Sequence, residues 1–212
     1  MFNKGNNLFN FKLDLDDDFI EIGGGEGDLS NDLIKLGCNV VLFIEPDKKK
    51  YKIALNKLKN VQCINVDVSK IDFAKIPNKS SNVTVIMQDV IEHISKVKQK
   101  KFFNELRKRY ERVSLIGRTP NLKSPFGLRN SFGDNTHLHR FTDISLKDFL
   151  IDLDFKNIYI TSEPYQITGI TSSIRYLPYL LSIYFISIIF LFVFGRWEGL
   201  LSPNLVFNSN NI

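Results

Sequence analysis

The segment Phe19–Asp28 constrains the fold of this chain most strongly, because it reads Phe-Ile-Glu-Ile-Gly-Gly-Gly-Glu-Gly-Asp. A short apolar run enters closely spaced glycines, and the residues after them carry leucines at helical spacing. Gly23, Gly25 and Gly27 lack a Cβ atom, so the backbone can turn sharply and approach a ligand closely. Exposed N–H groups at the start of the next helix favour an anionic group there. The segment therefore predicts a strand, a binding turn and a helix, and a purely structural turn is the alternative.

Strand-like and helical segments alternate along the first three quarters of the chain. The strand-like runs are almost continuously apolar, which is typical of parallel strands buried on both faces. This pattern predicts an α/β fold with a doubly wound, mostly parallel sheet. The expected strands are 19–22, 39–44, 61–66, 83–87, 113–117 and 156–162, and the expected helices are 28–36, 48–58, 97–110 and 145–153.

Composition and charge exclude several classes of protein. Hydrophobic residues make up 43% and charged residues 24%, which are ordinary globular values. Two cysteines cannot build a disulfide framework, and no Cys-x-x-Cys pair is present to hold zinc. The net charge of +5 favours an anionic partner, but the lysine-rich segments 48–59 and 96–112 lack interleaved aromatic residues. A nucleic-acid partner is therefore disfavoured, and two free thiols indicate a reducing compartment.

The spacing of the glycines separates two classes of cofactor. A dinucleotide-binding turn has the pattern G-x-G-x-x-G, whereas here the third glycine comes one residue early, giving E-x-G-x-G-x-G. This segment resembles motif I of the class I S-adenosylmethionine-dependent methyltransferases. The resemblance implies a seven-stranded Rossmann-like methyltransferase sheet and S-adenosyl-L-methionine as the cofactor.

Acidic residues at the next two strand ends extend the expected cofactor site. Glu45 ends the second strand, where a carboxylate can accept hydrogen bonds from ribose hydroxyls; its alternative is a surface carboxylate that caps the next helix. Asp67 ends the third strand, where the resembled family contacts the adenine amino group; its alternative is also a helix cap. The cofactor-binding residues that we expect are Glu21, Gly23, Gly24, Gly25, Gly27, Glu45, Pro46, Asp67, Val68, Gln88 and Asp89.

The fourth strand runs into Asp89-Val-Ile-Glu92-His93, the densest group of polar chemistry in the sequence. In a helical turn, Asp89, Glu92 and His93 would share one face. The segment resembles the Glu-x-x-Glu-His group that binds a divalent metal in small-RNA 2′-O-methyltransferases, with Asp89 in place of the first glutamate. We expect Asp89, Glu92, His93 and His137 to be catalytic. The same four residues are the candidate metal ligands. The alternative is that they form the floor of the active site through hydrogen bonds, without a metal.

A long loop, residues 118–142, interrupts the alternating pattern after the fifth strand and holds the other two histidines. Its motifs resemble methyltransferases found with bacterial surface-polysaccharide biosynthesis. The candidate substrate-binding residues in it are Arg118, Asn121, Asp134, His139 and Arg140, with the arginines placed to hold an anionic group. We therefore expect O-methylation of a small metabolite, sugar or polysaccharide precursor. Two alternatives stay open, an RNA 2′-O-methyltransferase and a non-catalytic, membrane-associated methyltransferase-like subunit.

The uncharged apolar stretch Leu177–Phe194 stands apart from the rest of the sequence. It reaches the lower length limit of a membrane-spanning helix, and it also suits packing on the domain, contact with a second copy or contact with a membrane interface. We expect a methyltransferase domain over residues 1–165 and an apolar helical extension over 166–212. The amino terminus has no secretory pattern, so the expected location is the cytoplasm, with membrane association through the apolar segment as an option.

Overall fold

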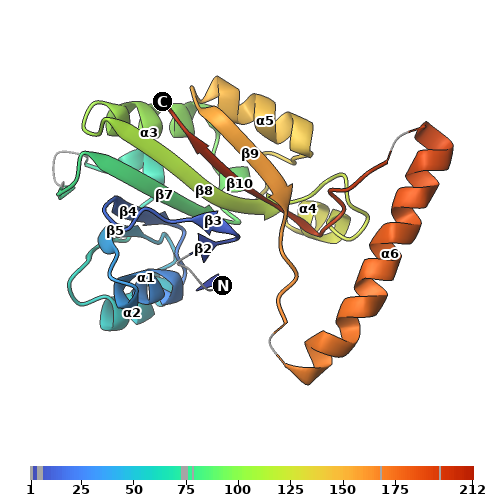
Figure 1. Ribbon diagram of the computed structural model, residues 1–212. Helices are drawn as coiled ribbons and strands as arrows, with labels where there is room; N and C mark the ends of the chain where they lie inside the picture. Colours follow the sequence, from blue (N-terminus) through green and yellow to red (C-terminus); the bar gives the residue numbers. More distant parts are fainter. Residues whose placement is uncertain (1, 4–6, 73–75, 78, 168, 196) are drawn as a thin grey trace.

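The computed structural model describes every residue except 1, 4–6, 73–75, 78, 168 and 196 (Figure 1). Its centre is a seven-stranded sheet with the order β6-β5-β4-β7-β8-β10-β9. Neighbouring strands from β6 to β8 are parallel, and β10 runs antiparallel to both of its neighbours. The strands are β4 (Asp18–Ile22), β5 (Asn39–Ile44), β6 (Gln62–Ile64), β7 (Asn82–Gln88), β8 (Arg112–Pro120), β9 (Lys156–Ser162) and β10 (Asn204–Asn210). The expected α/β fold with a mostly parallel seven-stranded sheet is confirmed.

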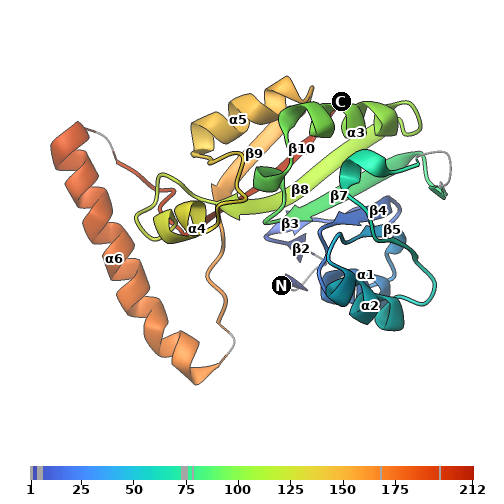
Figure 2. The same ribbon diagram turned by 180° about the vertical axis from the view of Figure 1, so that it is seen from behind.

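Alternate side chains of the strands face two different layers, as the pleat of a sheet requires. One face packs Ile20, Val85 and Leu115 into the largest apolar cluster, together with Phe103 and Leu150 from the helices above it. The segments that cover this face are η1 (Val68–Lys70), η3 (Ile91–His93), α3 (Lys96–Arg107) and α5 (Asp143–Asp152). Figure 2 shows α3 and α5 on the same side of the sheet.

The opposite face is covered in two parts. Helices α1 (Asp28–Lys35) and α2 (Lys48–Lys57) pack over β4 and β5 through Leu33 and Ala54. The rest of this face lies against a small antiparallel sheet of β1 (Phe2–Asn3), β2 (Asn7–Leu8) and β3 (Phe11–Lys12). In this layer Leu8 and Phe11 pack with Ile116 of β8. Sequence reasoning missed these N-terminal strands, because two-residue strands carry almost no periodic signal.

The order of the strands places a switch point between β4 and β7. The chain moves from β4 to β5 and β6 in one direction, and then from β7 to β8 in the other. Loops leaving the carboxyl ends of β4 and β7 therefore diverge, and ligands of open α/β sheets bind in the crevice between such loops. Gly23 follows β4 and Asp89 follows β7, so the fold brings these two residues to the same crevice.

The predicted division at residue 165 is wrong for the last part of the chain. Strand β10 pairs with β8 from Asn204 to Asn210, and it also pairs with β9. Its side chains Leu205 and Phe207 are fully buried in the main core. Residues 166–212 therefore do not form a separate extension, because their last strand lies inside the sheet. The strand has the sequence Asn-Leu-Val-Phe-Asn-Ser-Asn, in which only three adjacent residues are apolar, and it is not among the strands expected from the sequence.

Two helices occupy segments that the sequence left less defined. Helix α4 (Leu128–Gly133) lies inside the predicted 118–142 loop, and β8 continues into that loop as far as Pro120. Helix α6 (Ile170–Phe194) begins before the predicted apolar stretch and ends with it. Figure 1 shows α6 standing off the sheet, joined to it by one segment at each end. The structure contains this one helix long and apolar enough to cross a membrane among the described residues.

Candidate active site

The glycine turn after β4 is held against the neighbouring strand. The N–H groups of Gly23 and Gly24 donate to the carbonyl oxygen of Ile44, at 2.8 and 3.3 Å. Gly23 has φ of +66°, and a Cβ atom there would lie 2.4 Å from the Val90 Cγ2 atom. A side chain at position 23 therefore cannot fit without moving the segment that follows β7. The close approach of these two segments forms the floor of a cleft.

Glu45 lies at the end of β5 with its carboxylate turned toward the glycine turn. Its side chain is 5% exposed and accepts hydrogen bonds from the Gly25 N–H and the Asp47 N–H, both at 2.8 Å. Asp47, not Glu45, caps α2, since its carboxylate accepts from the N–H groups of Lys49 and Lys50. The helix-capping alternative for Glu45 is therefore wrong, and this carboxylate belongs to the cleft.

The cleft beside these residues has a volume of about 330 Å³. Of the predicted cofactor-binding residues, it brings together Gly23, Glu45, Pro46, Asp67, Val68 and Asp89. Asp67 has an ion pair with Lys98 at 3.4 Å and faces the cleft at the end of the β6 segment. Sequence reasoning missed the apolar part of the lining, because such residues look like ordinary core in a sequence. These are Ile22, Ile44, Val66, Val90 and Ile94.

Glu21 and four other predicted cofactor residues do not line this cleft. The Glu21 carboxylate lies beneath the turn, where it accepts hydrogen bonds from the Ser30 N–H at 3.1 Å and from the Ser30 hydroxyl. A Cβ atom on Gly24 would collide with the side chains of Glu21 and Phe43, at 2.7 and 2.2 Å. Glu21 therefore supports the turn from behind and does not contact a ligand in the cleft. The other residues outside the lining are Gly24, Gly25, Gly27 and Gln88.

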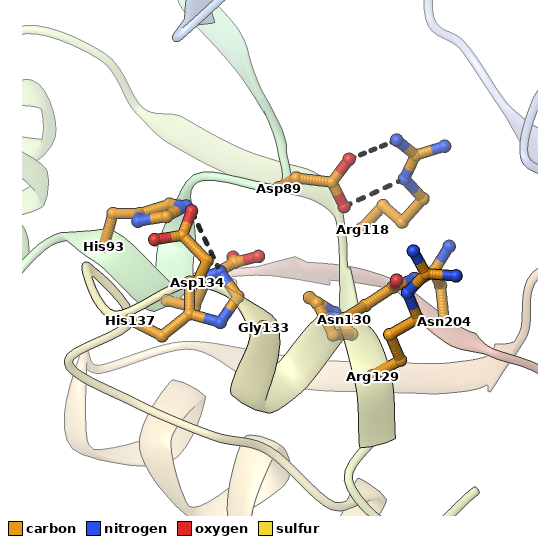
Figure 3. A pocket seen from close by; sticks show the side chains of 11 residues that line it. Asp89, His93, Arg118, Arg129, Asn130, Gly133, Asp134, His137 and Asn204 are labelled. Atoms are coloured by element: carbon orange, nitrogen blue, oxygen red, sulfur yellow. Dashed lines mark hydrogen bonds and ion pairs between the residues drawn. The ribbon is translucent and has the colours of Figure 1, made fainter. Parts of the chain in front are cut away.

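A second, more polar pocket adjoins the cleft and has a volume of about 480 Å³ (Figure 3). Asp89 and His93 line both cavities, so these side chains lie at the border between the two. The second pocket is built from the segments after β7 and β8, from α4 and from the start of β10. Its lining residues are Asp89, Glu92, His93, Arg118, Pro120, Arg129, Asn130, Gly133, Asp134, His137 and Asn204.

Asp89 points to Arg118 and away from Glu92 and His93. The Arg118 guanidinium donates to both oxygens of the Asp89 carboxylate, and it also donates to Glu163 at 2.9 Å. Asp89 has φ of +53°, and only Ile91–His93 form a helical turn, of the tighter 3-10 kind. The expectation that Asp89, Glu92 and His93 share one helical face is therefore wrong, and Asp89 falls outside the candidate metal group.

Glu92, His93 and His137 form a compact group of potential metal ligands. One carboxylate oxygen and one nitrogen from each imidazole all lie within 4.8 Å of one another. The three side chains come from both sides of the pocket, since His137 belongs to the loop after α4. This is the mixed nitrogen and oxygen donor set that several divalent transition metals accept. The described residues thus place three of the four predicted ligands together.

Hydrogen bonds outside this group orient both imidazoles. The Thr136 hydroxyl donates to Asp134 at 2.6 Å, so its oxygen, 2.9 Å from His93 Nδ1, accepts a hydrogen bond from that nitrogen. His137 Nδ1 lies 3.1 Å from the carbonyl oxygen of Ser131, which can only accept. Nδ1 therefore carries a proton in both rings, and Nε2 is the nitrogen left for another partner; His137 Nε2 lies 4.0 Å from Asp134 Oδ2. Such partners orient metal-binding or basic histidines.

Glu92 is a buried carboxyl group with no neutralising partner. Its side chain is 1% exposed, and neither of its oxygens has a hydrogen-bond partner among the described residues. Burial raises the pKa of Glu92 to about 8 and the nearby Asp89 adds to this increase, while the Thr119 hydroxyl and the Arg118 guanidinium act in the opposite direction. A buried acid without hydrogen-bond partners is costly unless a ligand or cation completes its environment. This arrangement is typical of a functional site.

Three of the five predicted substrate-binding residues have structural roles. Asn121 is fully buried, and its amide donates to the carbonyl oxygens of Leu200 and Ser202. His139 packs between the rings of Phe141 and Phe149, and Arg140 donates to the Ser131 carbonyl. None of these three residues lines the polar pocket, so the structure does not bring them to the candidate site. Arg118 and Asp134 do line the pocket, and the residues that sequence reasoning missed are Pro120, Arg129, Asn130, Gly133 and Asn204.

A mostly parallel seven-stranded sheet with a glycine cleft at its switch point defines a Rossmann-like methyltransferase fold. In agreement, residues 19–111 match the family model described as Methyltransferase domain, so the chain carries a methyltransferase domain over this range. The match covers the glycine turn, Glu45, Asp67 and the Asp89–His93 segment, and it ends before the His137 loop.

Solved structures with the same fold include several S-adenosylmethionine-dependent methyltransferases. One from Archaeoglobus fulgidus has a TM-score of 0.62 at 16% identity, and the match covers 92% of this chain and 86% of that one. Another from Clostridium acetobutylicum has a TM-score of 0.55 at 11% identity, with coverage of 91% and 83%. The methyltransferase domain of bacterial CtHen1-CN gives a TM-score of 0.54 at 16% identity, with coverage of 91% and 89%. At these identities the likeness concerns the fold.

A curated relative shows closer similarity over a shorter segment. An rRNA adenine N-6-methyltransferase from Limosilactobacillus reuteri is 43% identical over 79 residues, which cover 36% of this chain. The match spans 31% of the length of that relative, so the similarity concerns about a third of it. The methyltransferase domain, the fold and the cleft together support S-adenosyl-L-methionine as the cofactor.

Proposed function

We propose that this chain transfers the methyl group of S-adenosylmethionine to a hydroxyl group of a small polar acceptor, such as a sugar or a surface-polysaccharide precursor. One observation carries the proposal: the cofactor cleft and the polar pocket meet at Asp89 and His93. A donor in the first cavity and an acceptor in the second would therefore face each other across these side chains. Alignment of the two reactants is the main task of an enzyme that uses an activated donor.

The residues of the cleft fit the parts of this cofactor. Gly23 of the glycine turn lines the cleft, where the amino-acid group of the cofactor would lie, and the Glu45 and Asp67 carboxylates are acceptors for hydroxyl and amino donors. When bound, the cofactor supplies a methyl group that its positive sulfur has already activated. The ion pair between Asp89 and Arg118 holds the wall between the two cavities in place.

The chain then has to remove the proton of the acceptor hydroxyl. His93 and His137 both line the polar pocket, and in the neutral form with the proton on Nδ1 either Nε2 can serve as the general base. With a divalent cation bound, Glu92, His93 and His137 would hold it. The cation would lower the pKa of a bound hydroxyl and balance the buried charge of Glu92. The unpartnered Glu92 oxygens support a cation at this position.

An anionic group on the acceptor would find its partner in Arg129. The charge of Arg118 is already matched by Asp89 and Glu163. Arg129 lines the same pocket, and no carboxylate lies within ion-pair distance of it among the described residues. This favours a phosphate-bearing acceptor, such as a nucleotide-linked sugar.

RNA 2′-O-methylation and a non-catalytic role are the competing functions. The rRNA methyltransferase relative matches only part of this chain, so it does not by itself assign RNA as the acceptor. A non-catalytic subunit would not need an open cleft lined by Gly23, Glu45 and Asp67. Both functions remain distinct outcomes of the experiment below.

The deciding experiment supplies methyl-labelled S-adenosylmethionine and separate fractions of nucleotide sugars, lipid-linked saccharides and RNA to the purified chain. Mass spectrometry then searches each labelled product for the gain of one CH₂ unit. Label in a saccharide fraction supports the proposal, whereas label in RNA with steeply salt-dependent binding supports the alternative. Failure to bind the cofactor in calorimetry would instead indicate a non-catalytic subunit.

A further inference from the structure

Helix α6 lacks the polar face that a surface helix of a soluble protein carries. Its mean hydropathy over the best window is 2.4, and only 6% of that window is buried in the protein. Large apolar side chains are exposed over most of its circumference, including Leu180, Leu181 and Val193, which point in different directions around the axis. A second copy would cover one face of such a helix, whereas an apolar solvent covers every face.

The serine hydroxyls within α6 are satisfied by its own backbone. Ser182 donates to the carbonyl of Pro178 at 2.8 Å, and Ser173 donates to that of Gly169 at 3.0 Å. The Ser187 hydroxyl lies within hydrogen-bond distance of the carbonyls of Ile183 and Glu198. These hydroxyl groups therefore do not need water, which is what hydrocarbon surroundings require.

Both ends of α6 return to the same point of the sheet. The Glu163 N–H donates to the Asn204 carbonyl at 3.1 Å, and the Asn204 amide donates to Glu163 at 2.7 Å. The chain therefore leaves the sheet after β9 and re-enters it at β10 in the same place. We call residues 163–203, which contain α6 and whose two ends lie side by side at the sheet, the closed excursion. Beyond α6, Glu198 is fixed to the domain by Lys123 at 2.5 Å.

This closed excursion does not allow α6 to cross a bilayer. The helix is about 37 Å long, which exceeds the roughly 30 Å of a hydrocarbon core. Residues 195–203 would then have to recross the core as extended chain, at about 3.4 Å per residue, with unpaired backbone groups and with Glu198 in hydrocarbon. The ion pair between Glu198 and Lys123 would also have to break.

Charge and neighbouring apolar residues indicate the kind of surface. The sequence between Glu163 and Glu198 has no carboxylate, but it contains Arg175 and Arg196. Cations beside apolar residues complement anionic lipid headgroups. Figures 1 and 2 show α4 at the end of the sheet nearest to α6. Further exposed apolar side chains belong to the segment before α4, to α4 itself and to the segment that follows it as far as α5. They are Phe126, Leu128, Phe132, Leu138 and Ile144.

We propose that α6 inserts into one leaflet of an anionic lipid membrane with both of its ends on the same side, and so anchors the domain to that surface without crossing the bilayer. Aromatic side chains near its two ends, Tyr176, Tyr179 and Trp197, suit the boundary between headgroups and hydrocarbon. Among the options that the sequence leaves open for this segment, the proposal selects contact with a membrane interface.

The first test is flotation of the full chain with vesicles of phosphatidylcholine, with and without phosphatidylglycerol. We expect binding that is stronger to the anionic vesicles. The change Phe185→Asp, at an exposed position of α6, should weaken binding at least about tenfold while cofactor affinity is unchanged. Ile151→Asp, on the exposed side of α5, is the matched control and should bind as the unaltered chain does.

The second test determines on which side the ends of α6 lie. Ile167→Cys and Gly199→Cys, each in a Cys63→Ser background, place a thiol before and after the helix at exposed positions. A membrane-impermeant maleimide added outside sealed vesicles should label both. Protection of one thiol would show that the helix crosses and would overturn the proposal. Absence of vesicle binding together with a stable dimer in ultracentrifugation would overturn it in favour of a second copy.

Discussion

The imidazole rings of His93 and His137 lie edge to face with their centroids 4.6 Å apart. His93 follows β7 and His137 lies in the loop beyond β8, and these two strands are parallel neighbours up to the pair Gln88–Arg118. The N–H groups of Leu138 and His139 donate to the Glu92 carbonyl at 2.9 and 3.1 Å. Backbone contacts therefore set the distance between the two rings, and the side chains need little rearrangement to act together.

Replacement of either histidine should reduce methyl transfer strongly. We expect His93→Ala and His137→Ala to lower turnover by about 10²-fold or more, because each removes a base or ligand beside the acceptor. His137→Ala should bind the cofactor normally, since His137 does not line the cofactor cleft. Labelled methyl transfer and calorimetry measure the two quantities. His139→Asn is the control, and full turnover in both histidine variants would refute the assignment.

Metal binding should depend on Glu92 and not on Asp89. Glu92→Gln should weaken Mn²⁺ binding at least about tenfold, because it removes the only carboxylate of the described group. Asp89→Asn should leave Mn²⁺ affinity nearly unchanged, since its carboxylate is held by Arg118. Titration calorimetry of the cofactor-free chain measures both. Equal losses in the two variants would show that Asp89 turns to join the site.

Gly23→Ala should disable the cofactor cleft. The new Cβ would meet Val90 at 2.4 Å, and φ of +66° is unfavourable for alanine. We expect the affinity for S-adenosylmethionine to fall at least about tenfold, equivalent to about 1.4 kcal/mol. Gly199→Ala, where a Cβ has open space, should bind as the unaltered chain does. Normal affinity in Gly23→Ala would place the cofactor elsewhere.

Glu21 should make the stability of the domain depend on pH. Burial raises the pKa of Glu21 to about 7, from 4.5 in the unfolded chain. As pH rises from 4.5 to about 7, the unfolded chain loses this proton first, so the free energy of unfolding falls. The loss is at most about 3 kcal/mol. Glu21→Gln should show a smaller decrease in urea unfolding over this range, and identical pH slopes would contradict the assignment.

Phe207→Ala should destabilise the whole domain. Phe207 is fully buried, and its ring occupies the space above Gly117, where a Cβ would meet it at 2.3 Å. Loss of such a ring costs about 3–5 kcal/mol of unfolding free energy. Ile212→Ala, at a side chain that is 62% exposed, should change stability little. If residues 166–212 formed a separate extension, both variants would instead unfold like the unaltered domain.

The sequence predicted what short-range patterns can encode. The strand from Asn39 to Ile44 and the helix after Lys48 appear where hydrophobic spacing placed them, and the glycine turn lies at the switch point as expected. Pairing between distant segments has no such pattern. The place of β10 between β8 and β9, and the turn of Asp89 toward Arg118, depend on contacts between residues far apart in the sequence.

Within the site, the sequence predicted the side chains that carry the chemistry better than it predicted the residues that surround them. Glu92, His93 and His137 were all named, and they do lie together. Arg129 was missed, since an arginine on a short loop helix resembles any surface residue until the pocket around it is known. Asn121 shows the opposite case. It was predicted to bind substrate, but its side-chain amide donates to the backbone carbonyl of Leu200, in the segment before β10.

The position of β10 also bears on how the chain is made. Strand β9 pairs with β10 as its neighbour at the edge of the sheet, so it has no ladder partner until the ribosome has released residues 204–210. The whole of α6 emerges before that moment. An apolar segment of 25 residues is therefore available to a membrane or a chaperone while the sheet is still incomplete, and delivery to a bilayer can precede closure of the fold.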